Sequence, residues 1–217
     1  MKKRYIILIS AVLVTAIAAF PLLYRYNYVP HKKFDSEHFE ITEYKSPNDA
    51  DCDGIDDQTD ILKSALSYLD TEPKYKSRYY ADTGYPNDGY GVCTDVVAFA
   101  LRDAGYDLMV LVDEDISLSP ESYDIDAPDK YIDFRRVKNL SVYFERNAES
   151  LTTDTSRIEE WQAGDIVIWE GHIGILSSNR NRKGIPFVLH NANPYQASYE
   201  EDILTSYGEI KGHYRIN

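Results

Sequence analysis

The chain has 217 residues, and 23 lysines and arginines against 36 aspartates and glutamates give it a formal net charge of −13 at pH 7. This length fits one ordinary domain or at most two small ones, and a hydrophobic content of 43% excludes an intrinsically disordered chain. The acidic balance argues against a nucleic-acid partner, which would need clustered Lys and Arg. Two cysteines, Cys52 and Cys93, are too few for a disulfide framework.

The first 25 residues have the pattern of a membrane anchor or signal segment. Three basic residues at 2–4 precede an uncharged run at residues 5–24, which as a helix is about 30 Å long, the thickness of a bilayer core. The basic flank predicts a cytoplasmic N-terminus and an extracytoplasmic remainder. We expect residues 5–24 to stay as an anchor in the cell membrane. The alternative is cleavage after the small-x-small pattern at residues 16–18, followed by secretion.

Beyond this segment we expect a polar linker at residues 26–48, with one short strand at 39–44, and a single domain at 49–217. Apolar residues at helical spacing predict helices over 61–69, from Cys93 or Thr94 to a C-cap at Gly105, and over 140–151. Residues 71–91 and 113–137 are expected to be irregular. Strands are predicted at 165–169, 172–177, 186–191 and 210–216. Helices followed by an antiparallel meander predict an α+β fold.

The acidic loop at residues 49–60 has the spacing of a calcium-binding loop. Gly54 occupies position 6, where such a loop turns sharply, and a predicted helix follows. The predicted ligands are Asp49, Asp51, Asp53, the carbonyl of Ile55, Asp57 and Asp60. The alternative is a solvated loop in which Asp57 or Thr59 only caps the helix. A calcium ion here would be structural, with no part in catalysis.

Cys93 lies where a glycine-rich loop ends and a helix begins. The free backbone N–H groups and the helix dipole at such a position favour the thiolate, which is the reactive form of cysteine. The alternative is a buried cysteine that acts as a small apolar side chain. Asp95 is a candidate to cap the first turn of this helix, and also to oppose thiolate formation or to exclude acidic substrates.

Two histidines supply the imidazole that thiolate catalysis needs. His172 begins one predicted strand and His190 ends the next, so antiparallel pairing would bring them together. His190 is the candidate for orienting His172, and Asn191 is the fallback because strand register decides which side chain faces inward. Arg135 and Arg136 either bind a substrate carboxylate or form ion pairs.

The motifs around these residues resemble those of papain-like cell-wall cysteine peptidases of the NlpC type. They are residues 91–97 (GVCTDVV), 164–167 (GDIV), 172–175 (HIGI) and 190–191 (HN). A closer match resembles a bacterial family known as domain of unknown function 1287, through residues 84–86 (GYP), 92–95 (VCTD), 132–137 (IDFRRV) and 212–215 (GHYR). The resemblance covers roughly residues 55–217. It implies a papain-like fold with Cys93 as nucleophile, His172 as base and His190 as orienting residue.

The expected function is therefore that of an exported cysteine amidase or peptidase, acting by thiolate acyl transfer without a catalytic cofactor. Its expected substrate is a cell-wall peptide or another amide of the envelope. One alternative is a non-catalytic envelope binding module on the same fold. A third is a zinc hydrolase with His172, His190 and His213 as ligands.

Overall fold

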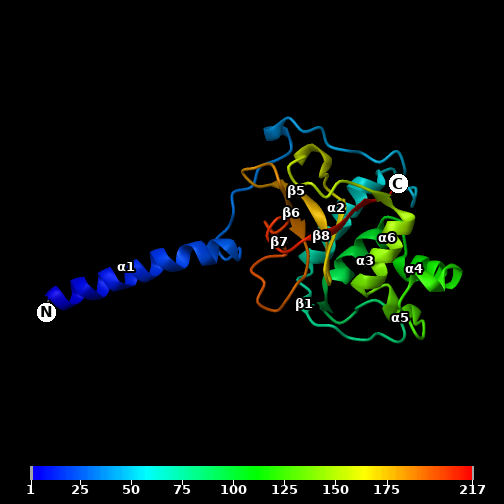
Figure 1. The fold of residues 1–217 in the computed structure, drawn as a ribbon, viewed down its shortest axis with the longest axis horizontal. Coiled ribbons are helices and arrows are strands. Elements are labelled where there is room, and N and C mark those ends of the chain that lie inside the picture. Colours follow the sequence, from blue (N-terminus) through cyan, green and yellow to red (C-terminus); the bar gives the residue numbers. More distant parts are fainter. Residues whose placement is uncertain (1, 217) are drawn as a thin grey trace. The chain divides into compact units, whose positions relative to one another are not determined.

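The computed structural model describes the backbone of residues 2–216 and their side chains apart from those of 2–4 and 6–12. The chain forms two compact units, the first ending at Lys32 and the second beginning at Lys33. The first unit contains helix α1 (Lys2–Arg25), visible in Figure 1. Within the described residues, no helix combines the length and apolar character needed to span a bilayer. The predicted anchor at 5–24 falls partly on side chains outside the described set, and it stays a prediction.

The second unit is built from short helices and a mainly antiparallel arrangement of strands (Figure 1). Its α-helices are α2 (Asp57–Asp70), α3 (Cys93–Asp103), α4 (Leu108–Leu118), α5 (Lys130–Asp133) and α6 (Val137–Asn147). Its strands are β1 (Lys74–Tyr75), β2 (Tyr90–Gly91), β3 (Glu149–Ser150), β4 (Ile166–Trp169), β5 (His172–Arg180), β6 (Pro186–Leu189), β7 (Glu200–Glu201) and β8 (Ile210–Arg215). The predicted α+β class is confirmed.

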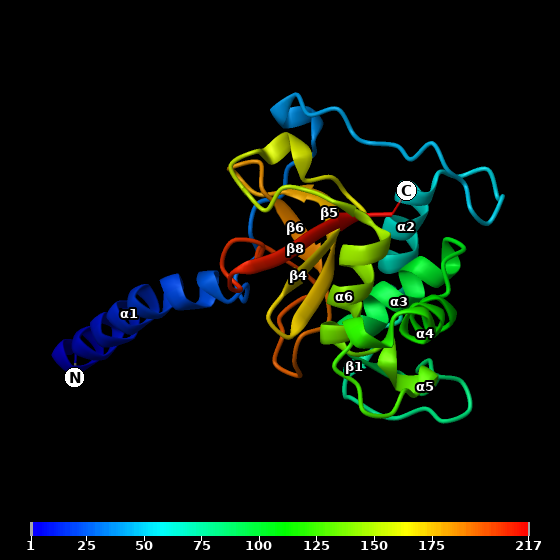
Figure 2. The same ribbon diagram turned by 45° about the vertical axis from the view of Figure 1, so that its right-hand side comes forward.

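The main sheet has the strand order β3-β8-β4-β5-β6-β7, with antiparallel neighbours throughout. Strands β1 and β2 form a separate parallel pair directly before α3. Figure 2 shows α3, α4 and α6 gathered beside the sheet, and α3 packs against β5 while α6 packs against β8.

Strand β4 shows how both faces of the sheet are covered. Ile166 and Ile168 belong to the cluster shared with the helices, whereas Val167 and Trp169 belong to a second cluster on the opposite face. Period-two alternation of side chains explains this division. Because both faces are buried, β4 is apolar at every position rather than at every second one.

The helices differ from the predictions mainly in their boundaries. Helix α2 begins at Asp57, four residues before the predicted start, because the Asp56 carboxylate accepts the Thr59 N–H and caps it. Helix α3 begins at Cys93 as predicted, and Gly105 follows its end with φ of 92°. The predicted helix at 140–151 is α6, which begins and ends a few residues earlier.

The prediction that residues 113–137 are irregular is wrong, because helix α4 extends through Leu118 and helix α5 follows. Leu108, Val112 and Ile116 recur at helical spacing and are buried. The acidic run within α4 obscured this pattern in the sequence. Asp115 is tolerated there because Arg146 donates to its carboxylate at 2.9 Å.

The strand predicted at 39–44 is also wrong, and the segment from Lys33 onward is part of the domain rather than a free linker. A 3-10 helix occupies Glu37–Phe39, and Phe34 pairs with Arg180 at the end of β5. The Arg180 side chain is 1% exposed, and its guanidinium donates to four oxygens. These are Ser36 Oγ and the carbonyl oxygens of Ile158, Trp161 and Gly184.

We expect Arg180→Met to lower the free energy of unfolding by about 3 kcal/mol or more, because three buried carbonyls would lose their donors. Urea denaturation of the domain measures this. Arg182→Met is the matched control, since Arg182 lies on the exposed turn two residues away. Equal stability of the two variants would contradict the role assigned to Arg180.

Candidate active site

The thiol of Cys93 lies at the first residue of α3 and is nearly buried, with 9% of the residue exposed. Burial raises the pKa of Cys93 to about 11, although hydrogen bonds from the backbone N–H groups of Ile173 and Thr94 act in the opposite direction. Ile173 directly follows His172 in β5. The sulphur therefore lies beside the strand that carries the candidate base.

Asp95 holds the start of this helix in place. Its carboxylate accepts the Val92 N–H at 2.8 Å and caps the first turn, and, beside the larger effect of burial, its negative charge also raises the pKa of Cys93, so the predicted cap and the predicted opposition to the thiolate both hold. Arg135 Nε and Nη2 donate to the same carboxylate at 2.6 and 3.0 Å, and both side chains are almost fully buried. Arg135 therefore forms an ion pair, and Arg136 pairs with Asp133 at 3.1 Å.

His172 and His190 meet on one face of the sheet, and their predicted adjacency is confirmed. Strands β5 and β6 pair antiparallel, and His172 Nε2 lies 3.0 Å from His190 Nδ1. Gly174 allows this approach: a Cβ there would lie 2.5 Å from Val188 Cγ1 and 3.0 Å from the Leu189 carbonyl oxygen. The glycine of the HIGI motif is thus required by the spacing of the two strands.

Asn191, the fallback orienting residue, points elsewhere. Its Nδ2 donates to the carbonyl oxygens of Pro73 at 2.8 Å and Gly91 at 3.3 Å. Asn191 thereby ties the end of β6 to the loop before Cys93, and brings the start of α3 to the end of β5 that carries His172. Its role is to join the two halves of the site.

Behind His190 lies Glu201 of β7, which the sequence analysis missed. Glu201 Oε2 is 3.2 Å from His190 Nε2, and the side chain is nearly buried. The only local signal in the sequence is a Glu-Glu pair between the strands predicted at 186–191 and 210–216. The register of β7 against β6 brings Glu201 to His190, because Glu201 pairs with Val188, two residues before His190. Its spacing in the sequence does not predict this contact.

The His172 ring is enclosed by aromatic side chains. Tyr207 stacks on it with ring centroids 4.3 Å apart and an interplanar angle of 21°, and Trp169 lies at 5.7 Å. Burial, with a smaller contribution from nearby His190, lowers the pKa of His172 to about 3. The imidazole is therefore neutral at pH 7, the form that can accept a proton.

Two partly exposed tyrosines border the thiol. The pKa values of Tyr75 and Tyr207 are raised first by burial and then by the proximity of Cys93. About two fifths of each residue is exposed. Both phenols therefore lie close to the thiol and are partly open to solvent.

His213, the third imidazole of the zinc alternative, is engaged elsewhere. Its Nδ1 is 2.7 Å from the Thr152 carbonyl oxygen and its Nε2 is 3.0 Å from Asp165 Oδ2. Asp165 is fully buried and also accepts from Arg215 Nε at 2.7 Å. With both ring nitrogens occupied, His213 does not converge with His172 and His190 on a metal position.

The acidic loop brings together three of the six predicted calcium ligands. Carboxylate oxygens of Asp49, Asp51 and Asp53 lie within 4.8 Å of one another. The pKa of Asp60 is raised by its burial and then by these three charges, which places it nearby. The same carboxylates accept loop N–H groups, and Ile55 donates its N–H to Asp53 Oδ1 at 2.8 Å.

Asp57 does not join this group. It is buried, its Oδ1 accepts the Ala50 N–H at 2.8 Å, and its Oδ2 accepts the Tyr106 hydroxyl. As the first residue of α2, it faces the helix side of the loop instead of the cluster. The helix cap is Asp56, neither Asp57 nor Thr59 as the alternative supposed.

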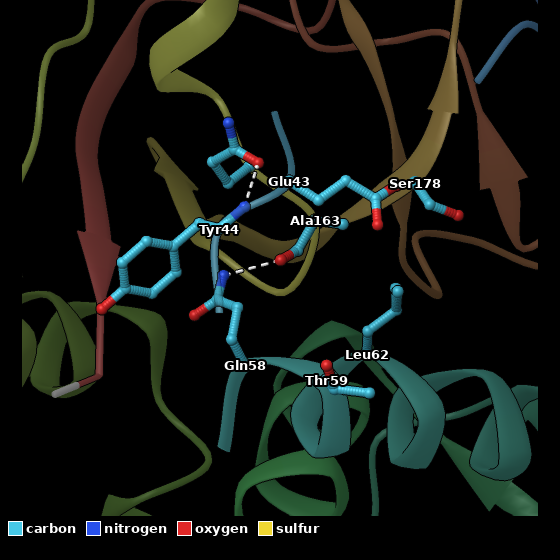
Figure 3. Close-up of a pocket in the computed structure, with 8 residues that line it drawn as sticks. Glu43, Tyr44, Gln58, Thr59, Leu62, Ala163 and Ser178 are labelled. Atoms are coloured by element: carbon cyan, nitrogen blue, oxygen red, sulfur yellow. Dashed lines mark hydrogen bonds between the residues drawn. The ribbon is translucent and has the colours of Figure 1, made fainter. Parts of the chain in front are cut away.

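A separate small recess lies between α2 and the segment before β4 (Figure 3), and none of the three catalytic candidates lines it. Gln58 Nε2 donates there to the Ala163 carbonyl oxygen at 2.6 Å, while Gln58 Oε1 is buried without a protein partner. At about 50 Å³ the recess holds little more than a water or two. It has no connection to the thiol chemistry.

The second unit is thus an α+β domain with a buried thiol at a helix start, beside the strand that carries one of two hydrogen-bonded histidines. The family described as domain of unknown function (DUF1287) matches residues 62–216, and the chain belongs to this family. It is similar to the uncharacterized protein YijF of Escherichia coli (strain K12). The two are 37% identical over 163 residues, covering 71% of this chain and 76% of YijF.

Calcium binding by the loop stays a prediction, which thermal melting tests. We expect millimolar calcium to raise the melting temperature, because an ion that binds only the folded state stabilises it, and sites of this kind bind at about 10⁻⁴–10⁻³ M. Asp51→Ala with Asp53→Ala should abolish the shift, whereas Asp70→Ala, an exposed aspartate at the end of α2, should retain it. If neither calcium nor a chelator changes the melting temperature of the wild type, the carboxylates serve only to accept the N–H groups of the loop.

The lowered pKa of His172 predicts an acid-sensitive stability. Between pH 6.5 and 3 the unfolded chain binds a proton that folded His172 does not, so wild-type stability falls as the pH falls through this window. His172→Gln removes this contribution and keeps a donor toward His190. Relative to the variant, the wild type should lose up to about 1.4 kcal/mol per pH unit in urea unfolding. His38→Gln, at an exposed histidine, is the control and should show the same dependence of stability on pH as the wild type. The lowered pKa of His172 would be contradicted if stability depended on pH equally in His172→Gln and the wild type.

Proposed function

We propose that the protein is a cysteine amidase or peptidase with a papain-like, NlpC-type domain, exported and held at the outer side of the cell membrane by residues 5–24. The observation that carries the proposal is the arrangement of three groups. The Cys93 sulphur accepts the N–H of Ile173, the preceding residue is His172, and His172 bonds to His190. Thiolate acyl transfer requires a nucleophile, a base beside it and a group that orients the base, and these three groups would fill those roles.

The ring geometry supports the role of His172 as base. Because Nε2 is bonded to His190, Nδ1 is the nitrogen left for proton transfer. Nδ1 is the ring nitrogen nearer the backbone, which is also where the sulphur lies, beside the Ile173 N–H. The stacked Tyr207 and the bond to His190 restrict rotation of the ring, so that Nδ1 is held in one orientation.

The proposed reaction has two steps. The Cys93 sulphur bonds to an amide carbonyl carbon, and the thiol proton passes through His172 to the leaving amine as the C–N bond breaks. Water then adds to the thioester carbonyl and its proton returns through His172 to the sulphur as the C–S bond breaks. The Cys93 backbone N–H, which as the first residue of α3 has no intrahelical acceptor, is the proposed oxyanion donor.

The proposed substrate is a cell-wall peptide or another amide of the envelope, with no nucleic acid and no catalytic metal required. This choice follows from the proposed export and from the resemblance of the sequence motifs to those of NlpC-type peptidases. A structural calcium ion in the 49–60 loop belongs to the same proposal.

A second candidate, a non-catalytic envelope binding module, is favoured by one observation. Burial raises the pKa of Cys93 to about 11, which disfavours the thiolate unless His172 takes the proton. The two candidates therefore differ in whether His172 activates the thiol.

Alkylation of Cys93 by iodoacetamide distinguishes them. Because Cys52 is exposed, the measurement uses a Cys52→Ser background, with Cys93→Ala as the blank. We expect His172→Ala to slow labelling at pH 7 by about a hundredfold. The residual rate should rise about tenfold per pH unit toward the raised thiol pKa. His38→Ala should leave the rate unchanged. Labelling indifferent to His172 would favour the binding module.

A further inference from the structure

We infer that Glu201 is a positioning residue that, acting through His190, sets the tautomer of His172 and so makes its Nδ1 the proton acceptor. The inference rests on the proposed function, which it extends from a thiol and two imidazoles to a chain of four groups. It is carried by the hydrogen bonds of the Glu201 carboxylate and by the order in which the ring nitrogens meet.

Both oxygens of Glu201 have assigned partners. Oε1 lies 3.2 Å from the Ala197 N–H nitrogen and 3.3 Å from that of Ser198, and Oε2 lies 3.2 Å from His190 Nε2. Backbone N–H groups can only donate, so Oε1 is fixed as an acceptor. Pairing of β7 with β6 and the bond from the His190 N–H to the Tyr199 carbonyl oxygen hold the two residues in this register.

The tautomers follow from this carboxylate. A carboxylate oxygen accepts, so His190 Nε2 carries the hydrogen and His190 Nδ1 keeps its lone pair. That lone pair faces His172 Nε2 at 3.0 Å, which must therefore carry a hydrogen of its own. In neutral His172 the remaining lone pair is then on Nδ1, the nitrogen proposed to receive the thiol proton.

The same series of hydrogen-bonded groups stabilises the positive charge that His172 gains when it accepts a proton. When His172 accepts a proton, its Nε2–H bond to His190 strengthens, and the positive charge lies one imidazole away from the Glu201 carboxylate. The intervening rings are almost fully buried, at 3% exposure for His172 and 1% for His190, so solvent does not screen this interaction. A buried carboxylate that orients an imidazole acts by both routes.

Glu201→Gln tests the inference because the substitution preserves shape and reverses one hydrogen bond. The side-chain oxygen of the variant should keep the N–H groups of Ala197 and Ser198, which leaves its NH₂ group facing His190 Nε2. An amide NH₂ only donates, so His190 would carry its hydrogen on Nδ1 and His172 on Nδ1 as well. The base would then hold a hydrogen where it needs a lone pair.

The first readout is the tautomer itself, obtained from ¹⁵N chemical shifts of labelled histidine rings. We expect Nε2–H for both His172 and His190 in the wild type and Nδ1–H for both in Glu201→Gln. A merely structural role for Glu201 would not move these signals. Nδ1–H at His190 in the wild type would overturn the inference without any variant, which keeps the test valid if Glu201→Gln fails to fold.

The second readout is iodoacetamide labelling of Cys93 at pH 7 in the Cys52→Ser background. Glu201→Gln should slow it at least about tenfold, and Glu201→Asp, which restores an acceptor-only group, should recover part of the rate. Glu200→Gln is the matched control, because Glu200 in the same strand bonds to Lys33 and Asn179 and not to His190. Slowing by His172→Ala but not by Glu201→Gln would reject only the role of Glu201. Indifference to His172→Ala would reject the proposed function itself.

Discussion

The position of the thiol depends on the buried ion pair between Asp95 and Arg135. Asp95 caps the helix that Cys93 begins, and Arg135 neutralises the carboxylate while it also donates to the Arg78 carbonyl oxygen at 2.6 Å. A carboxylate left alone at this depth would be costly, and so would an unpaired guanidinium. The pair therefore ties the helix start to two loops that are distant in sequence, although, beside the larger effect of burial, the Asp95 charge still raises the pKa of the thiol.

The imidazoles depend on a second constraint, the close approach of β5 and β6 at Gly174. Because His172 and Gly174 lie on the same face of β5, the absent side chain leaves room for His190 to reach across. Asn191 then turns the chain back to the loop before Cys93. One strand pair thus orients His172, the proposed base, and attaches the sheet to the helix that carries the thiol.

Burial keeps both the Cys93 thiol and the His172 imidazole uncharged. The thiol pKa is raised and the His172 pKa is lowered, so both groups are uncharged at neutral pH in the resting protein. Charge separation between them must come from groups that stabilise the products of proton transfer. Backbone N–H groups surround the sulphur, and the His190–Glu201 chain lies behind the imidazole. In the proposed reaction, buried hydrogen bonds therefore control proton transfer, whereas the exposed acidic residues that give the chain its negative charge take no part.

The sequence by itself determined the order of helices α2, α3 and α6 and of strands β4, β5, β6 and β8, including the helix that begins at Cys93 and the neighbouring strands that carry His172 and His190. These features depend on local periodicity and on residues adjacent in the chain. Helix α4, the docking of residues 33–48 around Arg180, and the separation of Asp57 from the other acidic loop residues were decided by tertiary contacts. So were the pairing of Asp95 with Arg135, the choice of His190 over Asn191, and Glu201 behind His190. The physical reason is that strand register and burial join residues from 11 positions apart, as for His190 and Glu201, to 144 apart, as for Ser36 and Arg180. Local sequence pattern carries no information about contacts at such separations.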